Sequence, residues 1–333
     1  MKAQILRKIS LAENRPLELI DLPIPQPGPK EILVKVSACG VCHTELDEIE
    51  GRVQSKLPVV LGHEIVGKVE GVGSEVTKFG IGDRVGIAWI YSACGRCHFC
   101  QEGNENLCSE FRATGCHADG GYAQYTVVSE DFAYPIPDRF TDSQAAPLLC
   151  AGAIGFRGLR LSGIKPGETL GLFGFGASAH IVLQVARFWG CEVFAFTRSE
   201  EHRRLARGLG AAWTGGPEDT PPRKVNGAID FTPVGETVAQ ALGVLEKGGR
   251  LVIAVIRKRN PIPPLDYAQL LWEEKEIKSV ANIARQDARD FLPLAAEIPI
   301  ITRVQEFRLE QANEALVLLK QGKIQGAAVL TMD

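Results

Sequence analysis

Up to about residue 150 the chain consists of short β-branched and apolar runs that are bounded by glycine, proline and other turn residues. These runs indicate a compact β-rich domain, with strands predicted at residues 31–37, 64–72 and 83–90. From about residue 169 the pattern changes, because apolar runs of strand length alternate with helical patterns of ten or more residues. Such alternation is typical of a parallel sheet covered by helices.

The second region is predicted to hold a helix at residues 178–189 and strands at residues 169–175, 192–197, 227–231 and 250–255. This order predicts an α/β fold class with a doubly wound parallel sheet of the Rossmann type. After about residue 290 mixed strand and amphipathic helix return, and one helical face carries Leu309, Ala312, Ala315, Leu316 and Leu319. We expect this tail to rejoin the first domain, so the predicted domains are a doubly wound domain at residues 150–289 and a β-rich domain at residues 1–149 and 290–333.

Composition and charge exclude several classes of protein. Of the 333 residues, 45% are hydrophobic and 23% are charged, so the chain can bury a full core. The formal net charge of -3 and the lack of a Lys/Arg-rich run argue against a nucleic-acid partner. Charges interrupt the apolar residues after Met1, and no apolar stretch approaches the ~20 residues of a membrane-spanning helix. We therefore expect a cytoplasmic protein without a membrane partner.

Four of the nine cysteines fall in one short window, CGRCHFCQEGNENLC, as Cys94, Cys97, Cys100 and Cys108. An odd cysteine count with such clustering favours metal ligation over a disulfide framework. Four thiolates this close in sequence can converge on one Zn²⁺ ion, and a closed all-sulfur shell leaves no position for a substrate, so a structural zinc is predicted. An iron–sulfur cluster is the rival occupant, and four thiols without a metal are the third interpretation.

Three further segments carry single residues that can ligate a metal: Cys42 in GVCHTEL, His63 with Glu64 in LGHE, and Cys150 in APLLCAG. Taken singly, each has an ordinary explanation as a buried cysteine or a hydrogen-bonded core histidine. Their spacing alone does not join them.

A small-residue turn follows the apolar strand that begins at residue 169 and opens the predicted helix; its residues are Gly174, Gly176, Ala177 and Ser178. Strand, glycine turn and helix in this order can receive a pyrophosphate at the helix N-terminus.

The segments GVCHTEL, LPVVLGHE, GDRV, the four-cysteine window, GGYAQY, APLLCAG and the glycine turn follow one another along nearly the whole chain. In this order and at similar intervals, they resemble the zinc-dependent medium-chain alcohol dehydrogenases. The resemblance implies a GroES-like fold for the β-rich domain and a catalytic zinc held by Cys42, His63 and Cys150, with Glu64 beside the metal. It also implies reversible oxidation of a small-molecule alcohol, for which we expect a primary one, to an aldehyde or ketone by hydride transfer to NAD(P)⁺.

The resemblance implies a role for the residues that follow Cys42. Two thiolates and one neutral imidazole would give the zinc site no net charge and leave one position open. Thr44 would take the proton of the alcohol, and Glu45 stands where relatives usually carry an aspartate that orients the histidine ligand. Relatives often end the proton relay at a histidine where this chain has Asp47, so the proton is expected to leave through Asp47, His43 or water.

The end of the second predicted strand bears on the choice of cofactor. An NAD enzyme usually has an acidic residue there, whereas this chain has Thr197, Arg198 and Ser199. A cation and two hydroxyls favour the 2′-phosphate of NADP, although two hydroxyls can also bind the ribose of NAD. An arginine that relatives often carry near the C-terminus is missing, and His43 could replace it in part.

Two zinc ions per chain are expected, one catalytic and one structural, together with a homodimer or homotetramer as the resemblance implies. A metal-free quinone or enoyl reductase is the nearest rival function, but such relatives lack the ligand set of Cys42, His63 and Cys150. A zinc-stabilised binding protein is a rival of another class. Thr44 argues against it, because a protein that only binds needs no proton relay.

Overall fold

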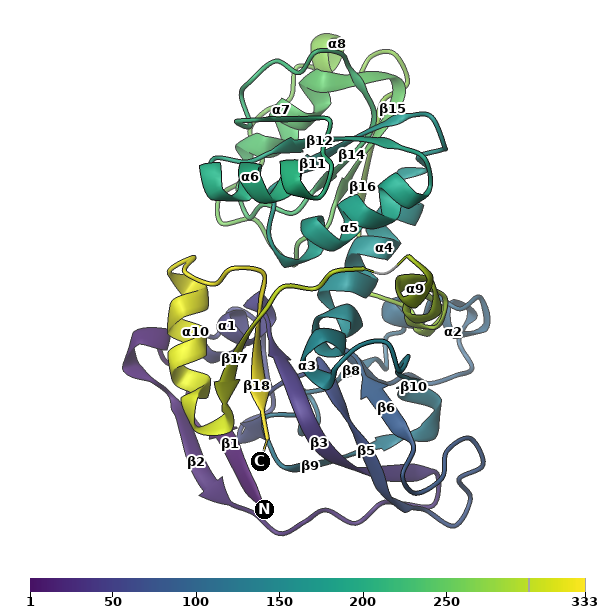
Figure 1. The fold of residues 1–333 in the computed structure, drawn as a ribbon, viewed down its shortest axis with the longest axis vertical. Helices are drawn as coiled ribbons and strands as arrows, with labels where there is room; N and C mark the ends of the chain where they lie inside the picture. The colour runs from purple at the N-terminus through teal and green to yellow at the C-terminus, as the bar shows by residue number, and fades with distance from the viewer. Residues whose placement is uncertain (299, 333) are drawn as a thin grey trace. The chain divides into compact units, whose positions relative to one another are not determined.

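The computed structural model describes residues 1–298 and 300–332. It divides the chain into two compact units, of which the first comprises residues 1–150, 283–296 and 302–333 and the second comprises residues 151–282 and 297–301 (Figure 1). Within residues 1–298 and 300–332, no helix is both long enough and apolar enough to cross a membrane.

The second unit is built on a six-stranded sheet in the order β13-β12-β11-β14-β15-β16. Every neighbouring pair in it is parallel. Its strands are β11 (Thr169–Phe173), β12 (Glu192–Phe196), β13 (Trp213–Gly215), β14 (Val225–Asp230), β15 (Leu245–Ile253) and β16 (Glu276–Ser279). The helices of the unit are α4 (Ala151–Ser162), α5 (Ala177–Phe188), α6 (Glu200–Gly208), α7 (Glu236–Val244) and α8 (Tyr267–Leu270).

Helices cover both faces of this sheet. The crossover β11-α5-β12 and the crossover β14-α7-β15 run in opposite directions along the strand order. Because crossovers between parallel strands are right-handed, α5 and α7 lie on opposite faces. The direction of winding reverses between β11 and β14, and ligands bind at the carboxyl ends of the strands at such a switch point. The predicted α/β class with a doubly wound sheet is confirmed.

The first unit contains three sheets. The largest has seven strands, in the order β10-β6-β5-β3-β18-β17 with β9 also paired to β3. Its strands are β3 (Glu31–Val41), β5 (Ile65–Val72), β6 (Arg84–Ile87), β9 (Tyr125–Ser129), β10 (Ala133–Pro135), β17 (Val304–Arg308) and β18 (Ala327–Thr331). The smaller sheets are β2-β1-β4 and β7-β8, formed by β1 (Lys2–Leu6), β2 (Leu17–Asp21), β4 (Val59–Val60), β7 (Ile90–Ser92) and β8 (Arg112–Ala113).

Helices and 3-10 turns connect these strands. The α-helices are α1 (His43–Ile49), α2 (His98–Gln101), α3 (Asp142–Ala145), α9 (Arg285–Glu297) and α10 (Ala312–Lys320). Single 3-10 turns are η1 (Ala12–Asn14), η2 (Glu105–Leu107), η3 (Glu130–Phe132), η4 (Ala146–Leu149) and η5 (Leu309–Gln311). Through β18, which pairs antiparallel with β3, the C-terminal segment completes the large sheet.

One expectation from the sequence needs correction in detail. The single strand predicted at residues 83–90 is two strands, β6 and β7, in different sheets. The chain leaves the large sheet at Ala88 and Trp89, whose carbonyl oxygens accept hydrogen bonds from the hydroxyl and backbone N–H of Thr114.

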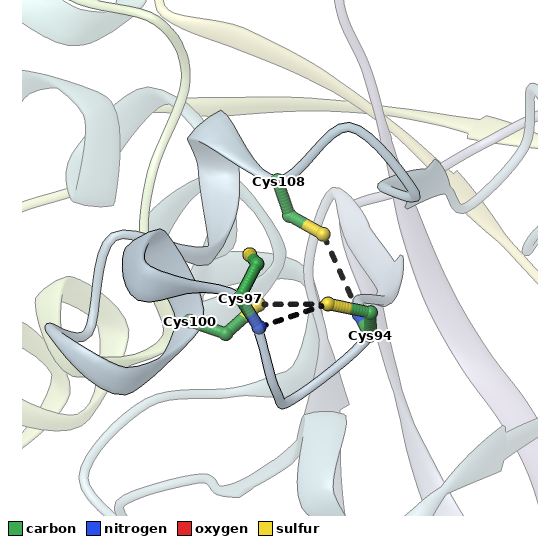
Figure 2. Close-up of side chains that lie close together, drawn as sticks. All are labelled: Cys94, Cys97, Cys100 and Cys108. Carbon is green, nitrogen blue, oxygen red and sulfur yellow. Dashed lines mark hydrogen bonds between the residues drawn. The ribbon is translucent and has the colours of Figure 1, made fainter.

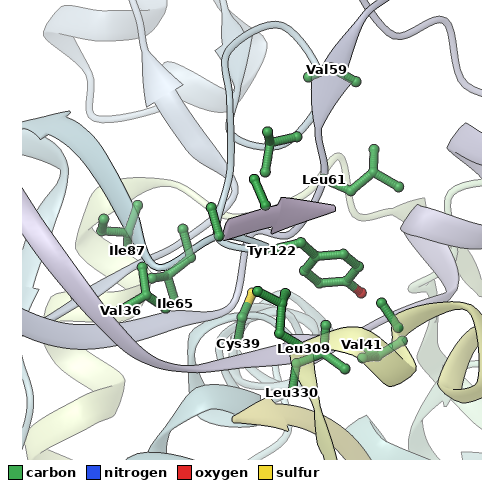
Figure 3. Packing of buried hydrophobic residues seen from close by; sticks show 14 of the residues in the cluster. Val36, Cys39, Val41, Val59, Leu61, Ile65, Ile87, Tyr122, Leu309 and Leu330 are labelled. Atoms are coloured by element: carbon green, nitrogen blue, oxygen red, sulfur yellow. The ribbon is translucent and has the colours of Figure 1, made fainter. Parts of the chain in front are cut away.

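The core of the first unit packs the inner faces of its strands against η5 and α10. Figure 3 shows the ring of Tyr122 in this core, with Leu61, Val41 and Cys39 around it. Gly62 has a φ of +98°, and a Cβ there would lie 2.4 Å from the Tyr122 ring. The chain therefore passes this ring closely just before His63.

Candidate active site and metal centres

Cys42, His63, Glu64 and Cys150 come together in the first unit, with one possible ligand atom of each within 4.8 Å of all the others. Cys42 is the N-cap residue of α1, His63 and Glu64 directly precede β5, and Cys150 follows η4. Ligand atoms around a tetrahedral zinc lie roughly 3.3 to 3.8 Å apart, given bonds of about 2.0 to 2.3 Å. The geometry and the donor types of this cluster fit Zn²⁺.

Glu45 joins the start of α1, at Cys42, to the segment before β5 that carries His63. Its Oε2 accepts a hydrogen bond of 2.8 Å from the backbone N of Cys42, and its Oε1 lies 2.6 Å from Nδ1 of His63. The His63 and Glu45 side chains are only 1% and 0% exposed. With Nδ1 turned to the carboxylate, Nε2 of His63 is buried and has no hydrogen-bond partner among the described residues. A buried imidazole nitrogen left in this state is the expected arrangement of a metal ligand.

The two thiols of the cluster interact with each other. A hydrogen bond from Cys150 lowers the pKa of Cys42 well below its ordinary value, and the same bond raises the pKa of Cys150. Burial opposes ionisation of His63, but the neighbouring Glu45 and Cys42 together outweigh it and raise the pKa of the imidazole. The cluster thus favours positive charge at its centre, where a cation would replace the shared protons.

Glu64 reaches the cluster because Gly40 leaves room for it. A Cβ at Gly40 would lie 1.8 Å from Oε2 of Glu64, so any larger residue would displace the carboxylate. The side chain is 3% exposed. Burial, followed by the negative charge of Cys42, raises the pKa of Glu64 well above its ordinary value.

Three further polar residues of α1 occupy different environments. Thr44 is 4% exposed, and its hydroxyl oxygen lies 3.6 Å from the sulfur of Cys42. His43 is exposed to solvent. Asp47 is 8% exposed and accepts a hydrogen bond of 2.6 Å from Nε of Arg52.

Four further cysteines form a second cluster, in which the sulfur atoms of Cys94, Cys97, Cys100 and Cys108 all lie within 4.8 Å of one another (Figure 2). The sulfurs of Cys94 and Cys100 are 3.9 Å apart. Backbone N–H groups of Cys94 and Cys97 point to the sulfurs of Cys108 and Cys94, at 3.5 and 3.4 Å.

The thiols of this second cluster differ in acidity. Hydrogen bonds from the backbone of Arg96 and Cys97 lower the pKa of Cys94 to about 6. Burial raises that of Cys100 to about 12. Four sulfurs that converge in this way form a closed donor set for Zn²⁺.

Helix α9 holds the lobe that carries these cysteines. Nε of Arg285 donates a hydrogen bond of 2.6 Å to Oε1 of Glu105 in η2, whose side chain is 5% exposed. The guanidinium also lies over the ring of Phe132, 5.0 Å from its centroid. A segment distant in the sequence thus fixes the lobe.

The glycine turn of the second unit lies at the carboxyl end of β11. Gly174 has a φ of +81°, and a Cβ there would lie 3.0 Å from Cγ2 of Thr232 at the end of β14. Gly176 is the N-cap residue of α5, no side chain caps this helix, and a Cβ at Gly176 would meet nothing within 4 Å. The N–H groups that open α5, beginning at Ala177 and Ser178, lie beside a turn with room for a phosphate.

The three residues after β12 differ in how free their side chains are to contact a ligand. Thr197 is 7% exposed, and the Ser199 hydroxyl accepts a hydrogen bond of 3.3 Å from the N–H of His202 as the cap of α6. Arg198 is exposed to solvent. Arg203 was not predicted from the sequence; its Nε donates a hydrogen bond of 2.9 Å to the carbonyl of Thr197 and so places a second guanidinium at this strand end. Its position one turn into the helix was the only available signal.

Two family models match the chain. The alcohol dehydrogenase GroES-like domain matches residues 28–138, and the zinc-binding dehydrogenase domain matches residues 179–297. A GroES-like domain followed by a doubly wound domain, together with two clusters of side chains that can ligate a metal, defines the zinc-type dehydrogenases of the medium-chain superfamily.

Full-length relatives narrow this class. The chain is 46% identical over 336 residues to "Probable alcohol dehydrogenase AdhA" of Mycobacterium tuberculosis, with 99% of this chain and 97% of the relative covered. It is 36% identical to an alcohol dehydrogenase of Geobacillus stearothermophilus, with 100% of both chains covered. A solved NAD-dependent alcohol dehydrogenase superposes with a TM-score of 0.92 at 28% identity over 100% of both chains. The chain belongs to the zinc-dependent alcohol dehydrogenase family, as its sequence motifs indicated, and is an NAD(P)-dependent enzyme.

Proposed function

We propose that Cys42, His63 and Cys150 hold the catalytic zinc of this alcohol dehydrogenase, with Glu64 beside the metal. The observation that carries this proposal is the convergence of their ligand atoms within 4.8 Å around a buried, unpartnered Nε2 of His63. When bound, zinc supplies a Lewis acid that polarises the oxygen of the substrate. Glu45 fixes the ring of His63 and selects the nitrogen that faces the metal.

Thr44 takes the proton of the alcohol in this proposal. Its hydroxyl lies 3.6 Å from the sulfur of Cys42 and is buried, so it can accept a hydrogen bond near the reacting oxygen and pass the proton on. Asp47 is already bound by Arg52, whereas His43 faces solvent. The proton therefore leaves through His43 and water, with Asp47 the less suitable of the expected exits.

We propose a second, structural zinc at Cys94, Cys97, Cys100 and Cys108, which makes two zinc ions per chain. Four protein sulfurs complete a tetrahedral shell and leave no place for a substrate. The hydrogen bonds that lower the pKa of Cys94 to about 6 favour the thiolate that a metal requires. This donor set gives no reason to prefer an iron–sulfur cluster over zinc, which the family already uses.

The dinucleotide is proposed to bind at the turn of Gly174, Gly176, Ala177 and Ser178, with its pyrophosphate at the N-terminus of α5. We propose a preference for NADP over NAD, because no carboxylate follows β12 and Arg198 is exposed there. Thr197 is buried and Ser199 caps α6, which leaves Arg198 as the residue that can fold over a 2′-phosphate.

The wider assignment follows from these sites. We propose that residues 1–149 and 290–333 form the catalytic domain, that residues 150–289 bind the dinucleotide, and that a primary alcohol is the substrate of this cytoplasmic enzyme. A homodimer or homotetramer is supported by β16, a terminal strand of its sheet whose four residues are all exposed. The aromatic side chains of Tyr267 and Trp272, which are 61% and 62% exposed, also support an interface between subunits.

Nicotinamide absorbance tests this function. The zinc-loaded enzyme is mixed with NADP⁺ or NAD⁺ and a series of primary and secondary alcohols, and formation of the reduced cofactor is followed. We expect turnover with wild type and none with Cys150→Ala. Turnover that does not depend on an alcohol, or that survives in Cys150→Ala, would contradict the proposed site.

A further inference from the structure

Asp230, at the carboxyl end of β14, is a fully buried acid with an exposed fraction of 0%. Its Oδ1 accepts hydrogen bonds of 2.8 and 2.7 Å from the backbone N and the hydroxyl of Thr232, and its Oδ2 accepts one of 2.8 Å from the hydroxyl of Thr237. The ion pair is completed by Nζ of Lys258, at 2.5 Å from Oδ2. The catalytic scheme above uses none of these residues.

The pair lies where the winding of the sheet reverses. Asp230 pairs in register with Phe173, the last residue of β11, and Gly174 follows directly. The Cγ2 of Thr232 lies 3.0 Å from the position of a Cβ on Gly174. Thr232 is therefore the wall of the glycine turn on the β14 side, at the switch point where a doubly wound sheet binds its ligand.

Lys258 also joins two loops at this edge of the sheet. Its Nζ donates a second hydrogen bond, of 2.8 Å, to the carbonyl of Thr232. The loop that carries Lys258 is fastened to the loop after β14 by the N–H of Arg259, which lies 2.7 Å from the carbonyl of Pro233. With only 11% of its side chain exposed, Lys258 is held in place rather than free in solvent.

We propose that Lys258 is a positioning residue for the dinucleotide. It cancels the charge of Asp230 beside the turn that receives the anionic pyrophosphate, and it keeps Thr232 against Gly174. Without it, a buried carboxylate would remain unbalanced next to the phosphate site and would repel either cofactor. The inference rests on the proposed cofactor site at the glycine turn.

The test is the dissociation constant of the zinc-loaded enzyme for NADP⁺ and for NAD⁺, measured by calorimetry, together with kcat at saturating cofactor. Lys258→Met is expected to raise both constants by more than about tenfold while kcat stays within a few-fold of wild type. Arg259→Met is the matched control, because it removes the same charge from an exposed neighbour on the same loop, and it should change both constants by less than about twofold. Circular dichroism and zinc content report whether each variant folds.

Two further variants keep the test decisive. Lys258→Gln removes the charge but keeps a donor for Asp230, so it is expected to fold and still to weaken binding by about fivefold or more. It replaces Lys258→Met in the test if the methionine variant does not fold. Asp230→Asn combined with Lys258→Met removes both charges and should bring both constants back to within about threefold of wild type.

Three results would overturn the inference: unchanged constants in a folded Lys258 variant, equal losses in the Lys258 and Arg259 variants, or no recovery in the double variant. A wild type that binds neither dinucleotide would instead contradict the proposed cofactor site, on which the inference depends.

Discussion

His63 shows how the site is determined at the scale of single residues. One ring nitrogen faces Glu45 at 2.6 Å, and the other is buried without a partner among the described residues. The carboxylate thereby fixes the orientation of the imidazole before any metal binds. Glu45 has one methylene more than the aspartate usual in relatives. Its carboxylate both contacts His63 and accepts a hydrogen bond from the backbone N–H of Cys42.

Thr44 gives the first prediction at this scale. Thr44→Val keeps the shape of the side chain but removes the hydroxyl that we propose receives the proton, so kcat should fall by about two orders of magnitude or more. Thr44→Ser is the control, since it keeps the hydroxyl and should retain most of the turnover. Steady-state kinetics with saturating alcohol measure both, and turnover near wild type in Thr44→Val would refute the relay.

Arg198 gives the second prediction. Arg198→Ala should lower kcat/KM for NADP⁺ by roughly tenfold through loss of a charge-assisted hydrogen bond, and leave kcat/KM for NAD⁺ nearly unchanged. Arg204→Ala, which removes another exposed arginine from the adjoining helix, serves as the control. A wild type that prefers NAD⁺ would defeat the preference itself. A preference for NADP⁺ that survives in Arg198→Ala would assign it to another group, such as the guanidinium of Arg203.

At the scale of elements, the C-terminus of α1 is joined to α10 by Glu50. Its side chain is 4% exposed, and its carboxylate accepts hydrogen bonds from Nζ of Lys320 at 2.6 Å and from the N–H of Ala12 at 3.1 Å. Burial alone would raise the pKa of this carboxyl group, but Lys320, Arg52 and Ala12 outweigh it and lower the pKa to about 2.

A pH dependence of stability follows from that shift. Because the pKa is lower in the folded state than the ordinary 4.5, the ionised group stabilises the fold fully above about pH 4.5, and this contribution is lost as the pH falls toward 2. Glu50→Gln should therefore lower the free energy of unfolding by roughly 1 to 3 kcal/mol at pH 7, with the difference vanishing at low pH. Urea unfolding measures it. Glu13→Gln, which changes an exposed partner of the same lysine, should lower the free energy of unfolding much less than Glu50→Gln. A pH-independent deficit in Glu50→Gln would exclude this origin.

The four-cysteine cluster and the cluster that contains Cys150 should respond differently to the loss of one cysteine. Cys100→Ala opens the closed shell of the lobe, so it should lose about one zinc ion per chain and lower the melting temperature while part of the turnover remains. Cys150→Ala should lose a similar amount of zinc but nearly all turnover, with the melting temperature less affected. Elemental analysis and thermal unfolding measure the contrast, and identical losses of activity would argue against distinct roles.

The sequence predicted four strands of the second unit, β11, β12, β14 and β15, and its glycine turn, because their apolar runs and turn residues are local signals. It did not predict the short β13 or the exposed β16. It did not predict the break between β6 and β7, which depends on Thr114 capturing the carbonyl groups of Ala88 and Trp89 from a distant segment. The pairing of Asp230 with Lys258, 28 residues apart, left no local pattern either. The proposed ligands Cys42, His63 and Cys150 were grouped only through resemblance to a family, since their spacing alone does not join them.

At the scale of the whole molecule, each proposed zinc site lies entirely within the first unit, and the glycine turn lies entirely within the second. Metal binding and dinucleotide binding should therefore be separable by mutation. Removal of zinc ligands is expected to leave the dissociation constant for NADP⁺ nearly unchanged, whereas changes at the glycine turn leave the zinc content intact.

The central claim, that zinc held by Cys42, His63 and Cys150 drives alcohol oxidation, is tested most directly by turnover measured against zinc content. The enzyme is dialysed against a chelator in steps, and zinc per chain and formation of reduced nicotinamide are determined on the same samples. We predict that turnover falls to zero as about one zinc ion per chain is removed and returns when zinc is added back. Full turnover in protein without zinc would contradict the account.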